Sequence, residues 1–276
     1  MLVQRWQTPV LDAADVYYRP PTMARPLALL SNDDGFQSPG LMALRTAMLE
    51  AWDVVVVAPE IEQSASSHAL SLRDPLRLRR VSDGVFALSG TPADCVYVAL
   101  HGGTRVLPRR PDLVVSGINL GLNLGQDAFY SGTIAAAREA ALRGIPALAA
   151  SSHTSLALAT VAAACVKLAT SLAANHADAP REVLLSANFP KGWNGKFRAT
   201  RLGRRIYEER VDFRTDPYGR DYLWLGGPGV RHAEDQGTDT DAYDQQVASV
   251  TPLELDLTCH EDLPITARIV EQAFGG

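Results

Sequence analysis

The segment LALLSNDDGFQSPG, residues 27–40, decides how the chain folds around its first strand. An apolar run of four residues leads directly into two adjacent carboxylates, Asp33 and Asp34. Ser38 is a good N-cap and Pro39 suits the first position of a helix, so the segment predicts a strand followed by a helix. In nucleotide-binding α/β proteins, glycines that receive a phosphate usually follow the first strand. Here the same place carries two negative charges, which any functional interpretation must explain.

The first 150 residues alternate short apolar runs with helical patterns, which is typical of βαβ units around a parallel sheet. The β-branched run at residues 54–58 is typical of a strand buried on both faces. The sequence predicts strands at 26–31, 54–58, 76–81, 85–89, up to Ser116, 146–151 and 182–187. It predicts helices after Ser38 and after the N-cap Thr91, and further helices at 132–143 and 155–174. The fold class is therefore α/β with a mainly parallel sheet.

The composition changes near residue 196, where glycine, proline, aromatic and charged residues mix. Short β-like runs such as YLWLGG (222–227) and VASVTPLELDLT (247–258) predict a β-rich extension, followed by a helix at 262–273. We divide the chain into a weakly ordered extension (1–24), an α/β catalytic core (25–195) and a β-rich extension with a C-terminal helix (196–276), the last two forming one functional domain. Met23 is a candidate for the natural start.

Charge and cysteine content narrow the function classes. The chain has 276 residues, of which 46% are hydrophobic and 21% charged, and its formal net charge is −5. A protein that binds a nucleic-acid duplex normally shows a basic face, so this class is not expected. Cys95, Cys165 and Cys259 lie among apolar neighbours without a CxxC pair, so we expect buried free thiols and a cytoplasmic location. We see no secretory signal and no run of 18 apolar residues, so no membrane partner is expected.

Three polar segments follow predicted strands, at residues 32–35, 64–67 and 116–119. Ligands of open parallel sheets collect at the carboxyl ends of strands, so we expect these segments to converge. Oxygen donors of this kind suit Mg²⁺ or Mn²⁺ better than zinc. A single Asp at a strand end is more often a turn or helix cap. The adjacent pair favours a metal site, because two carboxylates repel each other unless a cation lies between them.

A glycine-rich passage at 117–125 precedes Tyr130-Ser131-Gly132-Thr133, at a predicted helix start. Free backbone N–H groups there form a natural anion site, although a plain N-cap explains the same residues taken alone. The glycines match neither G-x-G-x-x-G nor G-x-x-x-x-G-K-[ST]. A cation site facing an anion-binding helix start indicates phosphate chemistry. The candidates for phosphate or substrate binding are Asn32, Ser67, Asn123, Ser131, Gly132 and Thr133.

Other catalytic schemes fit less well. The chain has no G-x-S-x-G nucleophile elbow. A phosphatase of the haloacid-dehalogenase type needs D-x-D after its first strand, whereas Asp33 and Asp34 are adjacent. Of the six histidines, only His68 lies near the predicted site, where it either assists substrate binding or proton transfer or is a surface loop residue.

Taken together, SNDDG, GTPADCV, PDLVVSGIN, NLG, YSGT, GIPALA and the later YLW, GTD and VTPL resemble the SurE family of metal-dependent 5'/3'-nucleotidases. The resemblance covers nearly the whole chain from about residue 26. It implies a Rossmann-like three-layer core with a β-rich extension used in oligomer contacts and arm exchange, and hence a homodimer or homotetramer. It implies one divalent cation per subunit (Mg²⁺ or Mn²⁺, with Co²⁺ or Ca²⁺ as alternatives). The implied ligands are Asp33, Asp34, Ser64 and Asn119.

The activity implied by the resemblance is hydrolysis of nucleoside 5'- or 3'-monophosphates to nucleoside and phosphate, with a range that can include short polyphosphate. The family commonly has S-G-x-S where this chain has Ser64-Ala65-Ser66-Ser67. It often has a basic residue before the ligand serine, where this chain has Glu62-Gln63. Alanine avoids conformations that glycine adopts, so we expect these departures to affect loop geometry and substrate preference rather than the reaction class.

We interpret Asp33 and Asp34 as catalytic metal ligands. Water whose pKa is lowered by the cation would attack phosphorus, and Ser131, Gly132 and Thr133 would hold the other phosphate oxygens. An adjacent Asp would accept the proton, and the sequence does not identify which. Two alternatives stay open: a non-catalytic sensor that binds a nucleotide through its phosphate, and another metal-dependent hydrolase on the same scaffold.

Overall fold

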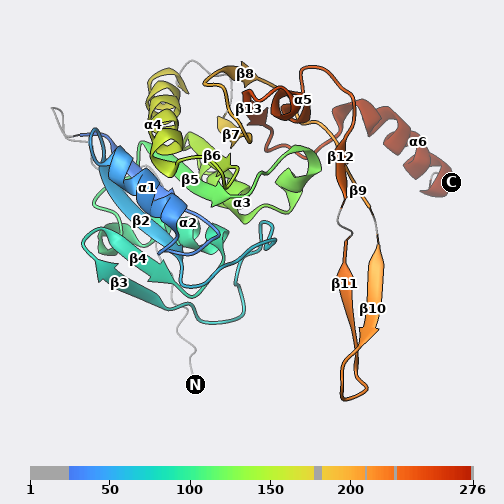
Figure 1. The fold of residues 1–276 in the computed structure, drawn as a ribbon, viewed down its shortest axis with the longest axis horizontal. Helices are drawn as coiled ribbons and strands as arrows, with labels where there is room; N and C mark the ends of the chain where they lie inside the picture. The colour runs from blue at the N-terminus through green and yellow to red at the C-terminus, as the bar shows by residue number, and fades with distance from the viewer. Residues whose placement is uncertain (1–24, 177–181, 209, 227–228, 275–276) are drawn as a thin grey trace.

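The computed structural model describes residues 25–176, 182–208, 210–226 and 229–274, so the predicted extension at 1–24, with Met23, lies outside the described residues. A central sheet contains nine strands. They are β1 (Leu27–Ser31), β2 (Asp53–Pro59), β3 (Leu78–Ser82), β4 (Val85–Leu88), β5 (Leu113–Leu120), β6 (Ala147–Ser152), β7 (Leu184–Phe189), β8 (Phe197–Ala199) and β13 (Ala248–Leu253). Their order is β3-β4-β2-β1-β5-β6-β7-β13-β8 (Figure 1). The strands from β4 to β7 in this order are parallel, which confirms the predicted α/β class.

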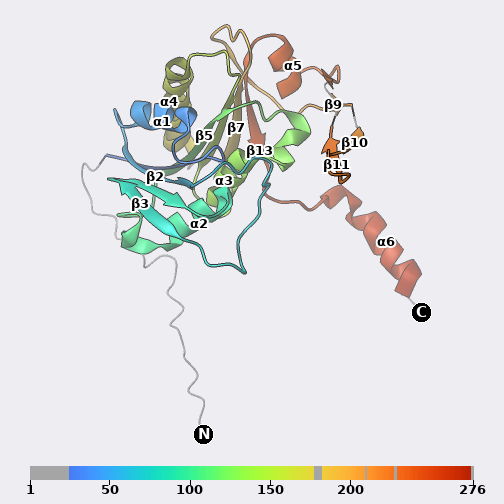
Figure 2. The same ribbon diagram turned by 60° about the horizontal axis from the view of Figure 1, so that its bottom comes forward.

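Helices cover both faces of the sheet. The helices of the core are α1 (Pro39–Met48), α2 (Pro92–His101), α3 (Gly132–Ala141) and α4 (Leu158–Asn175). Alternate residues of β1 belong to different clusters: Leu29 packs with α2 and α3, whereas Leu30 packs with α1 and α4. Figure 2 shows the resulting three layers, with α1 and α4 on one face and α2 and α3 on the other. Because β1 is buried on both faces, its sequence is continuously apolar.

The strand order places a topological switch point at β1. The chain moves from β1 to β2 and β4 on one side, and β5, β6 and β7 follow on the other. Crossovers on the two sides diverge, so a crevice opens at the carboxyl ends of β1 and β5, which is where ligands bind in open α/β sheets. Two of the three polar segments singled out in the sequence lie here: residues 32–35 follow β1, and residues 116–119 lie at the end of β5.

Strand β5 is longer than the sequence predicts. It continues past Ser116 to Leu120, and its register with β6 shifts between Ser116 and Asn119. The peptide bond between Gly117 and Ile118 is cis. The irregular end of β5 escaped the prediction because the Gly117-containing segment reads as a loop. In the structure this end of β5 places Asn119 at the edge of the crevice.

Part of the segment after residue 196 belongs to the core sheet. Strand β13 pairs antiparallel with β7, and β8 pairs with β13. The β-rich extension otherwise contains β9 (Arg205–Tyr207), β10 (Val211–Thr215), β11 (Asp221–Leu225) and β12 (Val230–His232), with α5 (Asp239–Asp244) and α6 (Leu263–Phe274). The β10–β11 hairpin and α6 both project away from the core (Figure 1). Neither the hairpin nor α6 contains a buried residue among those described.

The cysteines follow the prediction in two cases of three. All are free, and Cys95 and Cys165 are buried. Cys259 is exposed, so the prediction of a buried thiol was wrong for this residue. It lies between β13 and α6, where the chain has left the core, and its apolar neighbour Leu257 is itself 89% exposed.

By length and hydropathy alone, α4 is the one helix among the described residues that could cross a membrane. Its sequence contains Lys167, and Val161, Ala162, Cys165 and Ala169 are buried in the core. These contacts with the sheet account for the apolar composition of the helix.

Replacement of Ser38 tests how the end of β1 is joined to α1. The Ser38 hydroxyl caps the N–H of Leu41 and accepts a hydrogen bond from Asn32 Nδ2 at 2.7 Å. In Ser38→Ala both the cap and a partner of the buried Asn32 amide are lost, so we expect a loss of about 1–3 kcal/mol in the free energy of unfolding by urea. Thr46→Ala on the exposed side of α1 serves as control and should change stability by less than about 0.5 kcal/mol. Equal stability of the two variants would contradict the structural role of Ser38.

Candidate active site

A pocket of about 680 Å³ lies at the switch point. The residues that the sequence predicts as metal ligands all line it, together with Asn123 and Ser131 from the predicted substrate-binding set. These ligands are Asp33, Asp34, Ser64 and Asn119. They come from the ends of β1 and β5 and from the serine-rich loop after β2. The predicted convergence of three polar segments is therefore present in the fold.

Asp33 is packed against the start of α3. Its side chain is 5% exposed, and Oδ1 accepts a hydrogen bond from the Thr133 hydroxyl. A Cβ atom on Gly132 would lie 2.8 Å from Asp33 Cβ and 3.0 Å from Ser66 Oγ, so the helix can approach this closely only because residue 132 is glycine. Burial raises the pKa of Asp33, the Thr133 hydrogen bond lowers it and the charge of Asp34 raises it, so that the pKa is about 6.

Asp34 presents an oxygen that has no partner. Its Oδ2 atom is buried and makes no hydrogen bond within the part of the chain that the structure describes. Burial raises the pKa of Asp34, a hydrogen bond from the Leu120 backbone lowers it, and the charge of Glu62 raises it again. A buried carboxylate oxygen without a donor is costly unless a cation compensates it.

The donor set fits a hard divalent cation. Every candidate ligand is an oxygen, which suits Mg²⁺ or Mn²⁺. Asn119 uses Nδ2 to donate to the Gly121 carbonyl at 2.8 Å, which leaves its Oδ1 as the atom available to a cation. Within the described residues, no three His, Cys, Asp or Glu side chains form a metal-binding group, so Ser64 and Asn119 are needed to complete the set. The unpartnered Asp34 oxygen and the raised pKa values of both carboxylates agree with this fit.

The serine-rich loop is fastened to both sides of the pocket. The N–H of Gln63 donates to the Asp33 carbonyl at 2.8 Å, and that of Ser67 donates to the Tyr130 carbonyl at 3.1 Å. Between these anchors, the Ser64 hydroxyl donates to Glu62 Oε1 at 2.7 Å. Glu62 also lines the pocket, so one of the two departures from the family pattern lies directly beside a candidate ligand.

Several predicted substrate-binding residues have structural partners instead of facing the pocket. Thr133 is fully buried and uses its hydroxyl for Asp33. The Ser67 hydroxyl donates to the Phe129 carbonyl at 2.8 Å, and Asn32 is buried and donates to Ser38 and to the Gly35 carbonyl. Asn123 does line the pocket, with its amide held by Ser151 at 2.7 Å. The anion at the start of α3 is therefore the Asp33 carboxylate itself, which the sequence could not reveal.

His68 lies away from the pocket. Its Nε2 atom is 2.8 Å from Oε2 of Glu139, a buried residue of α3. His68 lines a separate cavity with Phe129 and Arg138. The His68 side chain therefore joins the serine-rich loop to α3 and is not a free surface residue.

Four pocket residues escaped the sequence analysis: Leu120, Asp127, Tyr207 and Leu225. Asp127 lies in the short helix η2 (Gly125–Phe129), within the glycine-rich passage, where an isolated carboxylate was a usable signal. Tyr207 and Leu225 come from the extension, more than 75 residues later in the chain. The Tyr207 hydroxyl donates to both carboxylate oxygens of Asp127, at 2.6 and 2.7 Å. Burial, together with this hydrogen bond, raises the pKa of Tyr207 to about 12, so the hydroxyl keeps its proton.

Replacement of Asp33 tests the electrostatic strain at the end of β1. In the presence of a chelator, a pKa raised from 3.8 to about 6 means that the contribution of Asp33 to stability is complete below pH 3.8 and is lost as the pH rises through about 6. The full loss corresponds to about 3 kcal/mol. Asp33→Asn does not ionise and can still accept the Thr133 hydroxyl. We expect the variant to gain stability relative to the parent between pH 4 and pH 8, by up to about 3 kcal/mol in urea denaturation. A constant difference between the two proteins across this range would contradict the prediction.

Ala65 tests the second departure from the family pattern. Its φ is +57°, in the left-handed region where a Cβ atom is unfavourable, so Ala65 adopts a backbone conformation that glycine would adopt at lower cost. We expect Ala65→Gly to stabilise the protein by about 0.5–1 kcal/mol, as measured by thermal or urea unfolding. The control Ala51→Gly, in an exposed turn where φ is not positive, should have the opposite sign. Destabilisation in both variants would argue against strain at Ala65.

Comparison with known proteins agrees with this geometry. The profile of the family described as Survival protein SurE matches residues 28–209. A 5'-nucleotidase SurE from Sorangium cellulosum (strain So ce56) is 59% identical over 235 residues, which cover 84% of this chain and 91% of that protein. A 5'-nucleotidase SurE from Geotalea daltonii is 43% identical over 242 residues, covering 86% and 96%. The crystal structure of a SurE protein from Aquifex aeolicus matches with a TM-score of 0.75 and 36% identity, covering 88% of this chain and 99% of that one. The chain therefore belongs to the Survival protein SurE family.

Proposed function

We propose that the chain is a divalent-metal-dependent 5'-nucleotidase, which hydrolyses nucleoside monophosphates to nucleoside and inorganic phosphate. Relatives at 59% and 43% identity, matched over more than four fifths of the chain, bear the name 5'-nucleotidase, in agreement with the predicted reaction class. The observation that carries the proposal is the gathering of Asp33, Asp34, Ser64 and Asn119 in one pocket at the switch point.

These four residues would hold one cation, Mg²⁺ or Mn²⁺, with Co²⁺ or Ca²⁺ as alternatives. When bound, such a cation neutralises charge on the phosphate and lowers the pKa of a water molecule. Water supplies the oxygen that bonds to phosphorus, and the bond from phosphorus to the ester oxygen breaks, so that the nucleoside leaves with a proton. Asp33 and Asp34 are the candidate proton acceptors.

Ser131 is the residue of the α3 start that remains suited to phosphate. Its hydroxyl oxygen accepts the Ile134 N–H at 3.1 Å, and the O–H proton is still available to a phosphate oxygen in the pocket. Gly132 leaves room between the helix and Asp33 but contributes no side chain. Thr133 acts on the phosphate indirectly, by holding Asp33.

Glu62 shapes the choice of substrate. Its carboxylate lines the pocket and accepts the Ser64 hydroxyl, and the pair Glu62-Gln63 stands where the family often has a basic residue before the ligand serine. An additional negative charge disfavours substrates that carry many charges. We therefore infer that nucleoside monophosphates are hydrolysed in preference to short polyphosphate.

We also infer a homodimer or homotetramer in the cytoplasm, without nucleic-acid or membrane partners. Exposed apolar side chains on the hairpin and on α6 support an oligomer: Phe213 and Trp224 are 71% and 61% exposed, and Phe274 is 86% exposed. Three free cysteines support a reducing compartment.

The decisive variant is Asp34→Asn. Loss of the charge at the unpartnered oxygen should lower kcat/KM for nucleoside 5'-monophosphates with Mn²⁺ by at least about a hundredfold, because transition-state charge is no longer neutralised. The measurement is release of free phosphate. Asp83→Asn, at an exposed turn between β3 and β4, is the matched control and should retain full activity. Full activity of Asp34→Asn, or of the parent in excess chelator, would contradict the metal mechanism.

The same assay separates the enzyme from its alternatives. A panel of nucleoside monophosphates should release phosphate, whereas tight binding measured by calorimetry without phosphate release would favour a nucleotide sensor. Hydrolysis of non-phosphate esters in place of nucleotides would favour a different metal-dependent hydrolase.

A further inference from the structure

One side of the pocket is built by segments that are distant in sequence. Asp127 comes from η2, and Arg205 and Tyr207 come from β9. Tyr207 donates to Asp127, and the Arg205 guanidinium forms an ion pair with the same carboxylate while lying over the Tyr207 ring at 5.3 Å. We call Asp127, Arg205 and Tyr207 the extension wall. Its position depends on whatever holds η2 and β9 together.

Asp239 joins the two halves of the extension wall. Its side chain is fully buried, Oδ2 accepts the N–H of Gly125 at 2.8 Å, and Oδ1 accepts the N–H of Gly203 at 2.7 Å. Gly125 is the first residue of η2, two residues before Asp127, and Gly203 lies two residues before Arg205. One carboxylate therefore fixes the backbone on both sides of the wall.

The segments around Asp239 pack so closely that neither Gly125 nor Gly203 has room for a side chain. A Cβ atom on Gly125 would lie 2.6 Å from the Gly203 carbonyl oxygen, and one on Gly203 would lie 2.1 Å from Thr240 Oγ1. The two segments and α5 meet backbone to backbone, so a shift of Asp239 is transmitted to both glycines.

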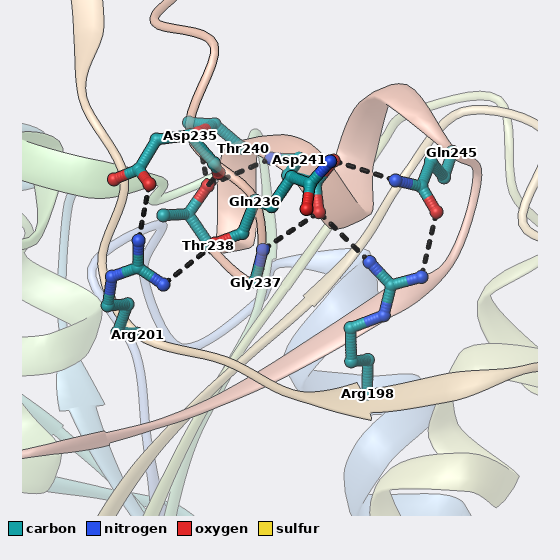
Figure 3. A network of polar contacts seen from close by, with 9 residues as sticks. All are labelled: Arg198, Arg201, Asp235, Gln236, Gly237, Thr238, Thr240, Asp241 and Gln245. Atoms are coloured by element: carbon teal, nitrogen blue, oxygen red, sulfur yellow. Dashed lines mark hydrogen bonds and ion pairs between the residues drawn. The ribbon is translucent and has the colours of Figure 1, made fainter.

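The segment that carries Asp239 is itself anchored. Figure 3 shows Arg201 donating to the Gln236 carbonyl at 2.8 Å and pairing with Asp235, while Arg198 contacts Asp241 at 3.1 Å. The Asp239 N–H donates to the Arg201 carbonyl at 2.9 Å. The GTD sequence at residues 237–239, which the catalytic proposal leaves unused, thus forms a rigid support behind the pocket.

We propose that Asp239 is a positioning residue for the nucleoside part of the substrate. The oxygen ligands around Asp33 and Asp34 suit the phosphate end of a nucleotide. The extension wall and its neighbours in the pocket lining offer a different surface: Tyr207 of the wall is 38% exposed, and beside the wall Leu225 is 79% and Tyr130 65% exposed. Aromatic and apolar surface of this kind binds a base or ribose. The inference rests on the proposed nucleotidase function, and assigns the second half of its pocket.

Asp239→Asn is the test variant, because it preserves size while replacing one acceptor oxygen with an NH2 group. At least one of the two backbone N–H groups then lacks an acceptor. We expect KM for a nucleoside 5'-monophosphate to rise at least tenfold with kcat changed by less than threefold, which is the pattern for loss of ground-state binding. For glycerol 2-phosphate, which has no nucleoside, kcat/KM should change by less than twofold. The Mn²⁺ affinity, measured by electron paramagnetic resonance, should also be unchanged.

Asp244→Asn is the matched control. Asp244 lies in the same helix and is 57% exposed, and its carboxylate contacts His232 but neither Gly125 nor Gly203. Its KM values for both substrates should stay within twofold of the parent. An equal loss on both substrates in Asp239→Asn, a loss of Mn²⁺ affinity, or the same nucleoside-selective change in Asp244→Asn would overturn the positioning role. None of these outcomes affects the nucleotidase proposal, whose failure would be seen separately, as the absence of phosphate release from nucleotides by the parent protein.

Tyr207→Phe provides a test that does not depend on the buried clamp. It removes the hydroxyl that joins Tyr207 to Asp127 and leaves Asp239 in place. We expect a nucleoside-selective rise in KM, smaller than that of Asp239→Asn, and a double variant whose KM is below the product of the two single effects. Unchanged KM in Tyr207→Phe, or independent effects in the double variant, would overturn the inference.

Discussion

Two carboxylates held side by side at the end of β1 repel each other, and most of the site depends on how this repulsion is managed. Asp33 receives the hydroxyl of Thr133 at the start of α3, and Asp34 receives the Leu120 backbone at the end of β5. These donors offset only part of the burial cost, since both pKa values remain raised. A divalent cation bound between the carboxylates would offset the remaining cost.

The N-terminus of α3 contacts a carboxylate of the protein itself. In nucleotide-binding α/β folds, a helix N-terminus commonly receives the phosphate directly. Here it receives Asp33, with Gly132 allowing the close approach. In the function proposed above, the phosphate is therefore bound through a cation and through Ser131. The carboxylates that looked out of place after β1 are what make this exchange possible.

Local patterns predicted the elements of the fold well, because caps and apolar runs act within a few residues. Ser38 and Thr91 do cap α1 and α2, and the ends of β1 and β5 do meet. The end of β5 and the partner of Thr133 were missed, since both depend on contacts with other segments. The extension wall could not be predicted for the same reason, because Asp127 and Tyr207 lie 80 residues apart and only the folded chain brings them together.

The excursion from β8 to β13 has both ends fixed in neighbouring positions of the sheet. Closure entropy grows only slowly with the length of such a loop, by about 0.6 kcal/mol for each doubling. The reach of the β10–β11 hairpin can therefore change by insertion or deletion at its tip, residues 216–220, with little effect on the sheet. Such changes would alter what this arm contacts, while the carboxylates at the end of β1 stay in place.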